Sequence, residues 1–271
     1  MNCAAPLVLI RGGGDLATGV AVRLHRCGFH VVITEIKTPL AVRRLVAFAQ
    51  AVYASECLVE DVRGRLAANP SEAISILEDG DVPVMIDPPA DCCKELEPAV
   101  LVDARMRKVA PEIGSEAADF VVALGPGFRV GRDCHAVVET NRGHDMGRVI
   151  WEGSAEADTS VPESVVGYDV DRVLRSPDDG MLMGGIPLTS LVDEGDQVAC
   201  VGNTTIIAPF RGILRGLLHD GVSVHADMKV GDLDPRMEPT YATRISDKAL
   251  AVGGGVLEAI LSQKEIRKTL R

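Results

Sequence analysis

Three consecutive glycines, Gly12–Gly14, separate a short apolar segment from a segment with helical periodicity. The apolar segment is Leu7–Ile10, and after the glycines Leu16, Val20 and Leu24 recur at the spacing of one helix face. A strand that turns tightly through glycine into a helix is typical of the start of a parallel α/β sheet.

The same alternation of strand-like and helix-like patterns continues to about residue 160. Further strand-like runs lie at 30–35, 57–62, 82–87, 99–103, 120–124 and 135–139. Helical patterns begin at Pro39, with apolar residues to Ala49 on one face, and at Asn69-Pro70, a favourable helix start. Continuous apolar strands separated by helices indicate a parallel sheet buried on both faces. We therefore predict a Rossmann-like α/β domain over residues 1–160.

The sequence pattern changes near residue 165, where short apolar segments alternate with Gly, Asp and Pro. Residues 176–182 (SPDDGML) are echoed by residues 208–214 (APFRGIL), and each copy closes on a Val-Gly pair. Two such copies cannot each bury a core, so we expect them to interlock. The pattern resembles the barrel-sandwich hybrid of biotinyl and lipoyl domains, predicted here over residues 165–236. Residues 240–271 become helical again and are expected to pack back onto the first domain.

The hairpin that joins the two repeats argues against a swinging-arm carrier. In biotinyl and lipoyl domains this hairpin holds the modified lysine, but residues 201–205 (VGNTT) contain none. Lys229 follows a methionine, as in the carrier motif, but it lies late in the second repeat. We therefore expect no lipoyl or biotin group.

Composition excludes several classes of protein. The 271 residues carry a formal charge of -11, which disfavours nucleic acid and anionic membranes, and 3% aromatic residues are too few for base-stacking platforms. No stretch approaches the roughly 18 apolar residues of a membrane helix. The cysteines show no C-x-x-C pair, and no histidine motif suggests a metal. We expect reduced thiols, no metal site and a cytoplasmic location.

The glycine run also fits a dinucleotide fingerprint. Gly12-x-Gly14-x-x-Ala17 follows a predicted strand and opens a predicted helix, and Glu35 closes the next strand. Gly12 would form the tight turn, Gly13 and Gly14 would bring backbone N–H groups to a pyrophosphate, and Glu35 would accept ribose hydroxyls. Asp15 opposes a pyrophosphate unless it turns inward to cap the helix. A sheet turn that only resembles a nucleotide site remains the alternative.

A second cluster follows the later strands, whose carboxyl ends should meet at the same edge of the sheet. It combines arginines, glycines and a histidine in loops, as an anion site would. Its candidate binding residues are Asp103, Arg105, Gly125, Gly127, Arg129, Asn141, Arg142 and His144. The alternative is that Arg105 and Arg107 are solvated and that His144 caps a helix. No catalytic residue can be assigned.

Several longer motifs resemble the family of selenium-dependent molybdenum hydroxylase system proteins. They are IRGGGDLATGVAVRL, VVITE with the following P-x-x-VRR, LGPGF, VVETNRGHDMGRV and VGGGVLEA. The N-terminal half is also similar, more distantly, to the Rossmann domain of xanthine dehydrogenase accessory factors, which help to sulfurate and insert the molybdenum cofactor. The resemblance implies a pathway more than a reaction.

Two functional hypotheses follow. In the first, the chain is an accessory protein that binds a nucleotide or a molybdopterin-type anionic cofactor and a molybdenum hydroxylase or another maturation protein. In the second, it is an NAD(P)-dependent oxidoreductase that uses the same glycine loop, with an acid/base such as His144 near the nicotinamide. The resemblance favours the first.

Overall fold

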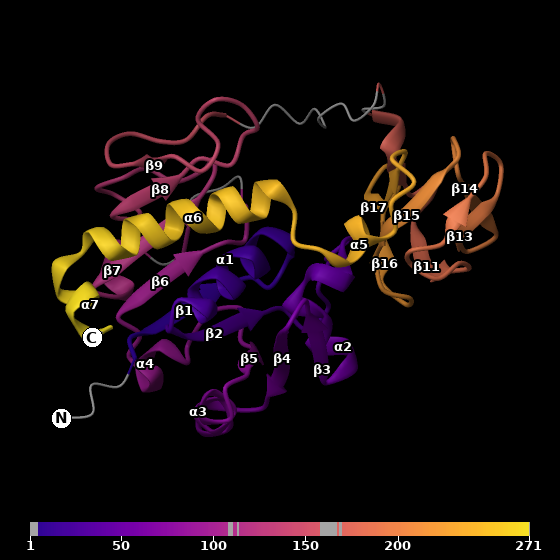
Figure 1. Cartoon of the computed structure of the whole chain (residues 1–271). Helices are drawn as coiled ribbons and strands as arrows, with labels where there is room; N and C mark the ends of the chain where they lie inside the picture. The colour runs from indigo at the N-terminus through magenta and orange to yellow at the C-terminus, as the bar shows by residue number, and fades with distance from the viewer. Residues whose placement is uncertain (1–4, 108–110, 113, 158–166, 168–169, 271) are drawn as a thin grey trace. The chain divides into compact units, whose positions relative to one another are not determined.

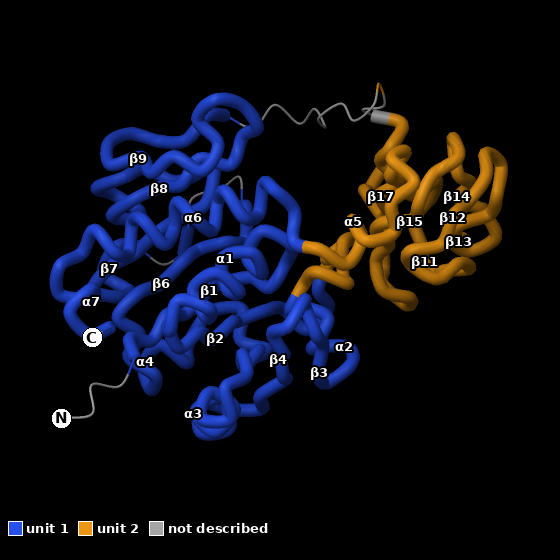
Figure 2. The backbone as a smooth tube through the Cα atoms, viewed as in Figure 1, with its two compact units in different colours: residues 1–39, 48–158, 245–271 blue, residues 40–47, 159–244 orange. Residues whose placement is uncertain are grey.

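The computed structural model describes residues 5–107, 111–112, 114–157, 167 and 170–270 (Figure 1). The chain forms two compact units (Figure 2). Unit 1 comprises residues Met1–Pro39, Phe48–Asp158 and Ile245–Arg271, and unit 2 comprises Leu40–Ala47 and Thr159–Arg244. Each unit is described by itself below.

A nine-stranded sheet forms the centre of unit 1, in the order β3-β4-β5-β2-β1-β6-β7-β8-β9. Its strands are β1 (Leu7–Arg11), β2 (His30–Glu35), β3 (Glu56–Val59), β4 (Val62–Ala67), β5 (Val82–Ile86), β6 (Val100–Asp103), β7 (Phe120–Leu124), β8 (Ala136–Val138) and β9 (Val149–Ile150). All neighbours from β4 to β8 are parallel, and only the outermost strands β3 and β9 pair antiparallel. The chain runs outward from β1 in one direction to β2 and in the other to β6. The predicted mixed α/β class with a largely parallel sheet is therefore confirmed.

The helices of unit 1 lie against this sheet (Figure 1). They are α1 (Asp15–Arg26), α2 (Ala51–Ala54), α3 (Pro70–Glu78), α4 (Cys93–Leu96), α6 (Asp247–Ser262) and α7 (Lys264–Thr269), with the 3-10 turns η2 (Phe48–Gln50) and η3 (Ser115–Ala117). Asn69 caps α3 as expected, because its side chain accepts the N–H of Glu72 at 2.9 Å. A core including Leu9, Val32 and Leu101 fills one face of the sheet.

Two predictions for residues 39–62 are wrong. The helix expected from Pro39 to Ala49 is replaced by η1 (Arg44–Val46), η2 and the short α2. Its supposed single apolar face is split, since Val42 packs on Gly216 of unit 2 and Ala49 packs on Gly13 of unit 1. The strand expected at 57–62 is the hairpin β3-β4, which turns at Glu60 with φ of 54°.

The C-terminal helix α6 packs along α1 (Figure 1). Small residues allow a close approach: a Cβ added to Gly253 would lie 2.9 Å from the carbonyl oxygen of Gly19. On the same face, a Cβ added to Gly19 would lie 2.7 Å from the Cβ of Ala249. The contact is therefore specific to glycine at these positions.

Unit 2 contains two antiparallel sheets of four strands each, in the orders β10-β17-β15-β12 and β14-β13-β11-β16. The strands are β10 (Val173–Arg175), β11 (Gly180–Gly184), β12 (Leu191–Val192), β13 (Gln197–Val201), β14 (Thr204–Ile207), β15 (Gly212–Leu217), β16 (Ser223–Val224) and β17 (Lys229–Asp234). The 3-10 turn η4 (Val170–Arg172) precedes them and α5 (Thr240–Thr243) follows them. Lys229 begins β17 opposite Arg175 and lies outside the β13-β14 hairpin.

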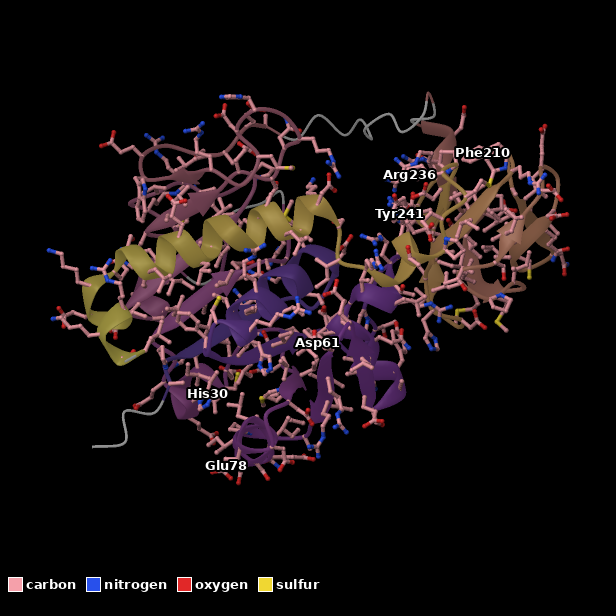
Figure 3. All side chains as sticks on the ribbon, in the orientation of Figure 1. His30, Asp61, Glu78, Phe210, Arg236 and Tyr241 are labelled. Carbon is pink, nitrogen blue, oxygen red and sulfur yellow. The ribbon has the colours of Figure 1, made fainter. Side chains whose placement is uncertain are left out.

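A network of ion pairs lies within the β15-β17 sheet of unit 2. Asp232 and Asp234 are 3% and 0% exposed, and Arg215 contacts both carboxylates. Arg236 donates to Asp234 at 2.5 Å, and its guanidinium carbon lies 4.3 Å from the centre of the Tyr241 ring (Figure 3). These contacts fix the end of β17.

No helix among the described residues combines the length and apolar character required to cross a bilayer.

Candidate functional site

The carboxyl ends of the parallel strands bring the predicted site residues to one edge of the unit 1 sheet. The glycine loop follows β1, and each glycine has its own role there. Gly12 has φ of +94°, and its N–H donates to the Thr34 carbonyl at 2.7 Å. A Cβ at Gly13 would lie 2.9 Å from the backbone nitrogen of Ala49, whereas a Cβ at Gly14 would meet nothing within 4 Å. The loop is thus tightly held on one side and open at Gly14.

Gly14 is also the N-cap residue of α1 and, as a glycine, provides no side chain to cap this helix end. Asp15 is the residue after the N-cap and lies in the first turn of the helix. The first backbone N–H groups of an α-helix have no partner within the helix, and the positive end of the α1 dipole lies at Gly14, where a side chain would meet nothing within 4 Å. An anion would be stabilised there.

Glu35 lies beside this loop at the end of β2. Its carboxylate accepts the N–H of Gly13 at 2.8 Å and the N–H of Ile36 at 2.7 Å. Ile86 pairs with Glu35 across the sheet, and Ile36 and Ile86 are 40% and 44% exposed. The edge thus combines a carboxylate with two exposed aliphatic side chains.

Asp103, at the end of β6, holds two arginines next to the glycine loop. Arg105 forms a fork on this carboxylate, with Nε–Oδ1 of 3.0 Å and Nη2–Oδ2 of 2.6 Å. Arg11, the last residue of β1, lies 3.5 Å from the same carboxylate and donates to the carbonyl of Pro88 at 2.9 Å. The Arg105 side chain covers Gly12, since a Cβ there would lie 3.3 Å from its Cγ.

Arg11 is 1% exposed and was not predicted from the sequence as a site residue. Burial, followed by repulsion from Arg105, lowers the pKa of its guanidinium, while Asp103 opposes that effect. The signal that could have identified it is a charged residue at the end of an otherwise apolar strand. Such residues at the carboxyl edge of a parallel sheet commonly face the ligand site.

The loops after β7 and β8 are fixed by a different carboxylate. Glu139 is 2% exposed and accepts the backbone N–H groups of Thr140 at 2.7 Å, Asn141 at 2.7 Å and Glu156 at 2.8 Å. The side chain of Asn141 donates to Glu156 at 2.6 Å. Gly125 has φ of +68°, and its N–H donates to the Val138 carbonyl at 2.9 Å. The β8 loop is therefore rigidly organised around Glu139, a residue that the sequence did not single out.

The predicted arginines of this edge have three different surroundings. Arg105 binds Asp103, whereas Arg142 forms a fork on Asp247 of α6, with both nitrogen–oxygen distances at 2.7 Å. Arg129 and His144 are exposed, as is Gly127. The structure therefore unites Gly12–Gly14, Glu35, Asp103 and Arg105, and it directs Arg142 to the start of α6.

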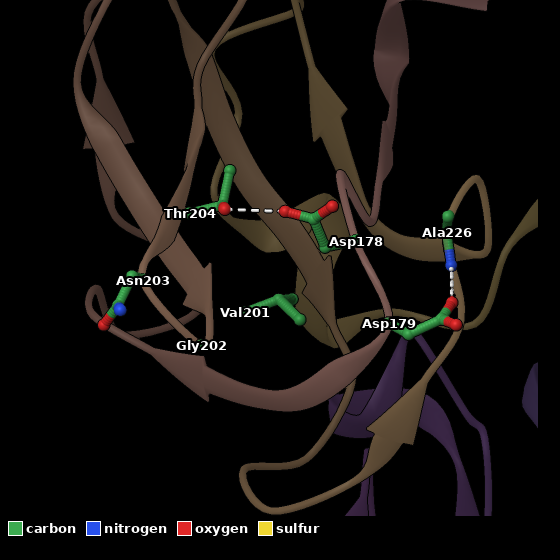
Figure 4. Close-up of a pocket in the computed structure, with 7 residues that line it drawn as sticks. All are labelled: Asp178, Asp179, Val201, Gly202, Asn203, Thr204 and Ala226. Atoms are coloured by element: carbon green, nitrogen blue, oxygen red, sulfur yellow. Dashed lines mark hydrogen bonds between the residues drawn. The ribbon is translucent and has the colours of Figure 1, made fainter.

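Unit 2 contains a separate open pocket of about 460 Å³ (Figure 4). It is lined by Asp178, Asp179, Val201, Gly202, Asn203, Thr204 and Ala226. Asp178 accepts the hydroxyl of Thr204 at 2.7 Å, and Asp179 accepts the N–H of Ala226 at 2.8 Å. Asp178 thereby fixes the β13-β14 hairpin, where the sequence lacks a lysine, and Asp179 fixes the connection between β16 and β17.

The part of the chain that the structure describes contains no group of three or more His, Cys, Asp or Glu side chains suited to a metal ion.

The chain is similar to a curated bacterial protein. The chain is 48% identical over 255 residues to the uncharacterized protein YqeB of Escherichia coli K12. The match covers 94% of this chain and 47% of that protein, so the chain spans about half the length of this curated relative. No family model matches.

Solved structures give only remote similarity. An aspartoacylase family protein from Mesorhizobium loti aligns over 84% of this chain and 85% of its own, with 10% identity and a TM-score of 0.27. The ectoine utilization protein EutE (DoeB) from Ruegeria pomeroyi aligns in its apo form over 85% and 86%, with 11% identity and a TM-score of 0.25.

Proposed function

We propose that this chain binds a nucleotide, or a molybdopterin-type cofactor with a phosphate group, at the glycine loop of unit 1. The observation that carries the proposal is the N-terminus of α1, which begins at a glycine with open space beside it and lies directly next to the Glu35 carboxylate. Backbone N–H groups and the helix dipole suit a phosphate, and the carboxylate suits the hydroxyls of a sugar. The strand order β5-β2-β1-β6-β7-β8, which reverses at β1, supports a Rossmann-like domain.

The surroundings of the loop favour an organic phosphate over a free one. Two exposed isoleucines lie next to Glu35: Ile36 follows it in the chain, and Ile86 pairs with it on the neighbouring strand β5. Exposed aliphatic side chains next to a polar anchor are suited to the flat face of a base or pterin ring. Arg11 and Arg105 supply positive charge in a protein whose formal charge is -11.

The biological role that we propose is that of a cytoplasmic accessory protein in the maturation of a selenium-dependent molybdenum hydroxylase. The motifs that resemble that family support this role. Unit 2 would then serve as a docking surface for the hydroxylase or another maturation protein, without a covalent lipoyl or biotinyl arm. Its two antiparallel sheets of four strands each support a barrel-sandwich hybrid fold.

Native mass spectrometry of the freshly purified protein tests the ligand directly. We expect a copurifying nucleotide or pterin, visible as an added mass that denaturation releases. The apoprotein mass alone, before and after incubation with NAD, ADP-ribose or a pterin phosphate, would contradict the proposal. Hydride transfer to or from NAD that disappears in His144→Ala would instead support an oxidoreductase.

Glu35 provides a test of which nucleotide binds. A carboxylate at this position accepts ribose hydroxyls and repels a 2′-phosphate. We expect Glu35→Gln to weaken NAD roughly tenfold and to weaken NADP less or not at all. Gln retains an acceptor for the Gly13 N–H, so the loop should persist. Equal titration curves for wild type and variant with both nucleotides would leave the loop as a feature of the fold only.

A further inference from the structure

Three arginines at the carboxyl edge of β1 and β6 converge on one carboxylate, that of Glu112. Arg105 donates to it at 3.0 Å, and Arg11 lies 3.8 Å from it. Arg107 also forms an ion pair with it. A carboxylate that binds several guanidinium groups occupies the position that an exogenous anion would take.

The two carboxylates in this cluster differ in how firmly they are held. The Asp103 side chain is 4% exposed and lies at the end of a central strand. The Glu112 side chain is 54% exposed and lies outside the helices and strands. Asp103 is therefore a permanent part of the cluster, whereas Glu112 can leave it at little cost, because exposed ion pairs contribute little free energy.

The cluster also lies next to the glycine loop. Arg11 directly precedes Gly12, and Arg105 packs over that glycine. Three guanidinium groups against two carboxylates leave one positive charge among these five residues. The repulsion between Arg105 and Arg11, which lowers the pKa of Arg11, is relieved by further negative charge.

We propose that Glu112 is an internal substitute for a phosphate group, and that a phosphomonoester or pyrophosphate ligand displaces it from Arg11, Arg105 and Arg107. This deepens the proposed function, because it adds a second anion subsite next to the loop at Gly14. Glu112 thereby lowers the affinity of the free protein for phosphate and excludes weaker monoanions.

Titration of inorganic pyrophosphate by isothermal calorimetry at low ionic strength tests the displacement. Glu112→Gln removes the competing charge and should tighten pyrophosphate binding about five- to tenfold. Arg105→Gln should weaken it by a similar or larger factor. Glu116→Gln is the matched control, because it removes the same charge only four residues further along the chain. The Glu116 side chain accepts the backbone N–H of Gly114.

The outcomes separate this inference from the proposed function. If Glu112→Gln and Glu116→Gln bind pyrophosphate equally, or if neither Glu112→Gln nor wild type binds it, the displacement is wrong. If Glu112→Gln alone binds more tightly while no nucleotide binds at any concentration, the anion subsite stands and the nucleotide proposal fails. Glu112→Asp, which shortens the side chain, should give an intermediate affinity with an unchanged thermal midpoint.

Discussion

At the scale of single residues, two carboxylates organise the carboxyl edge of unit 1: Glu35 accepts the N–H of Gly13, and Asp103 pairs with Arg105 and Arg11. Gly12, Gly14 and Glu35 were predicted from their order along the chain, and the structure places them together at the start of α1. Arg11 and Glu112 were not predicted, because their significance arises from contacts between strands and loops far apart in sequence. The local pattern marks Arg11 only as a charged residue at the end of an apolar strand, and it does not reveal the contacts that the side chain makes.

Arg142 has a structural contact that its position in the sequence does not indicate. The sequence placed it among anion-binding residues, whereas the structure shows a fork on Asp247 at the start of α6. We expect Arg142→Ala to lower the free energy of unfolding by about 0.5–1 kcal/mol, because the pair is partly exposed. A double-mutant cycle with Asp247→Ala in urea unfolding should give a coupling of similar size. Additive effects, together with lost nucleotide binding in Arg142→Ala, would return Arg142 to the ligand site.

At the scale of elements, parallel strands were easier to predict than their connections. The strands β1, β2, β5, β6 and β7 could be predicted from their apolar runs, because buried parallel strands have few polar residues. The hairpin β3-β4 was missed, since its turn at Glu60 contains no glycine or proline. The helix expected after Pro39 was missed because its apolar residues pack in two different units.

The contact between α1 and α6 gives a prediction with a neighbouring control. Gly253→Ala should destabilise the protein by about 1–3 kcal/mol, because the new methyl group would lie 2.9 Å from the Gly19 carbonyl. Gly254→Ala, where nothing lies within 4 Å, should stabilise it by about 0.5–1 kcal/mol through helix propensity. Equilibrium unfolding in urea measures both. The same sign for the two variants would show that α6 does not pack on α1 as described.

The end of β17 predicts a pH dependence. Burial raises the pKa of Asp234, but hydrogen bonds from Arg236 and the charge of Arg215 outweigh it, so the pKa lies below the ordinary 3.8. A depressed carboxyl pKa contributes stability that is present above the unfolded pKa and is lost as the pH falls through the folded pKa. We expect the difference in thermal midpoint between wild type and Asp234→Asn to shrink as the pH falls below about 4. A difference that is constant from pH 7 to pH 3 would contradict this.

At the scale of the whole molecule, the unexpected feature is that residues Leu40–Ala47 belong to unit 2 although they are embedded in the sequence of unit 1. Arg43, 8% exposed, donates to the carbonyls of Tyr241 at 2.9 Å and Arg244 at 3.0 Å. The sequence offered no indication of this, because the resulting contacts join residues 198 and 201 positions apart. The change of sequence pattern near residue 165 nevertheless indicated an all-β segment, and residues 173–234 form antiparallel sheets.

Arg43 therefore tests the assignment of this segment. We expect Arg43→Ala to destabilise unit 2 by about 2–3 kcal/mol, because two charge-assisted hydrogen bonds are lost in a buried position. Tyr241, whose ring lies under Arg236, is a local reporter of that unit by near-ultraviolet circular dichroism. Lys37→Ala, at an exposed position, is the control. Equal effects of the two substitutions would show that the segment does not hold unit 2 together.

The central claim is that the open N-terminus of α1 binds the phosphate of a nucleotide or pterin. Titration of NAD and ADP-ribose into wild type and Gly14→Val tests it most directly. Gly14 has φ of -71° and ψ of -176°, which valine adopts without strain, and there is open space for a side chain at this position. We expect saturable binding to wild type, loss of at least a hundredfold in affinity for Gly14→Val, and a free variant that still unfolds cooperatively, with a thermal midpoint only a few degrees lower because valine is a weaker N-cap than glycine. Equal affinities for both proteins, or no binding to either, would contradict it.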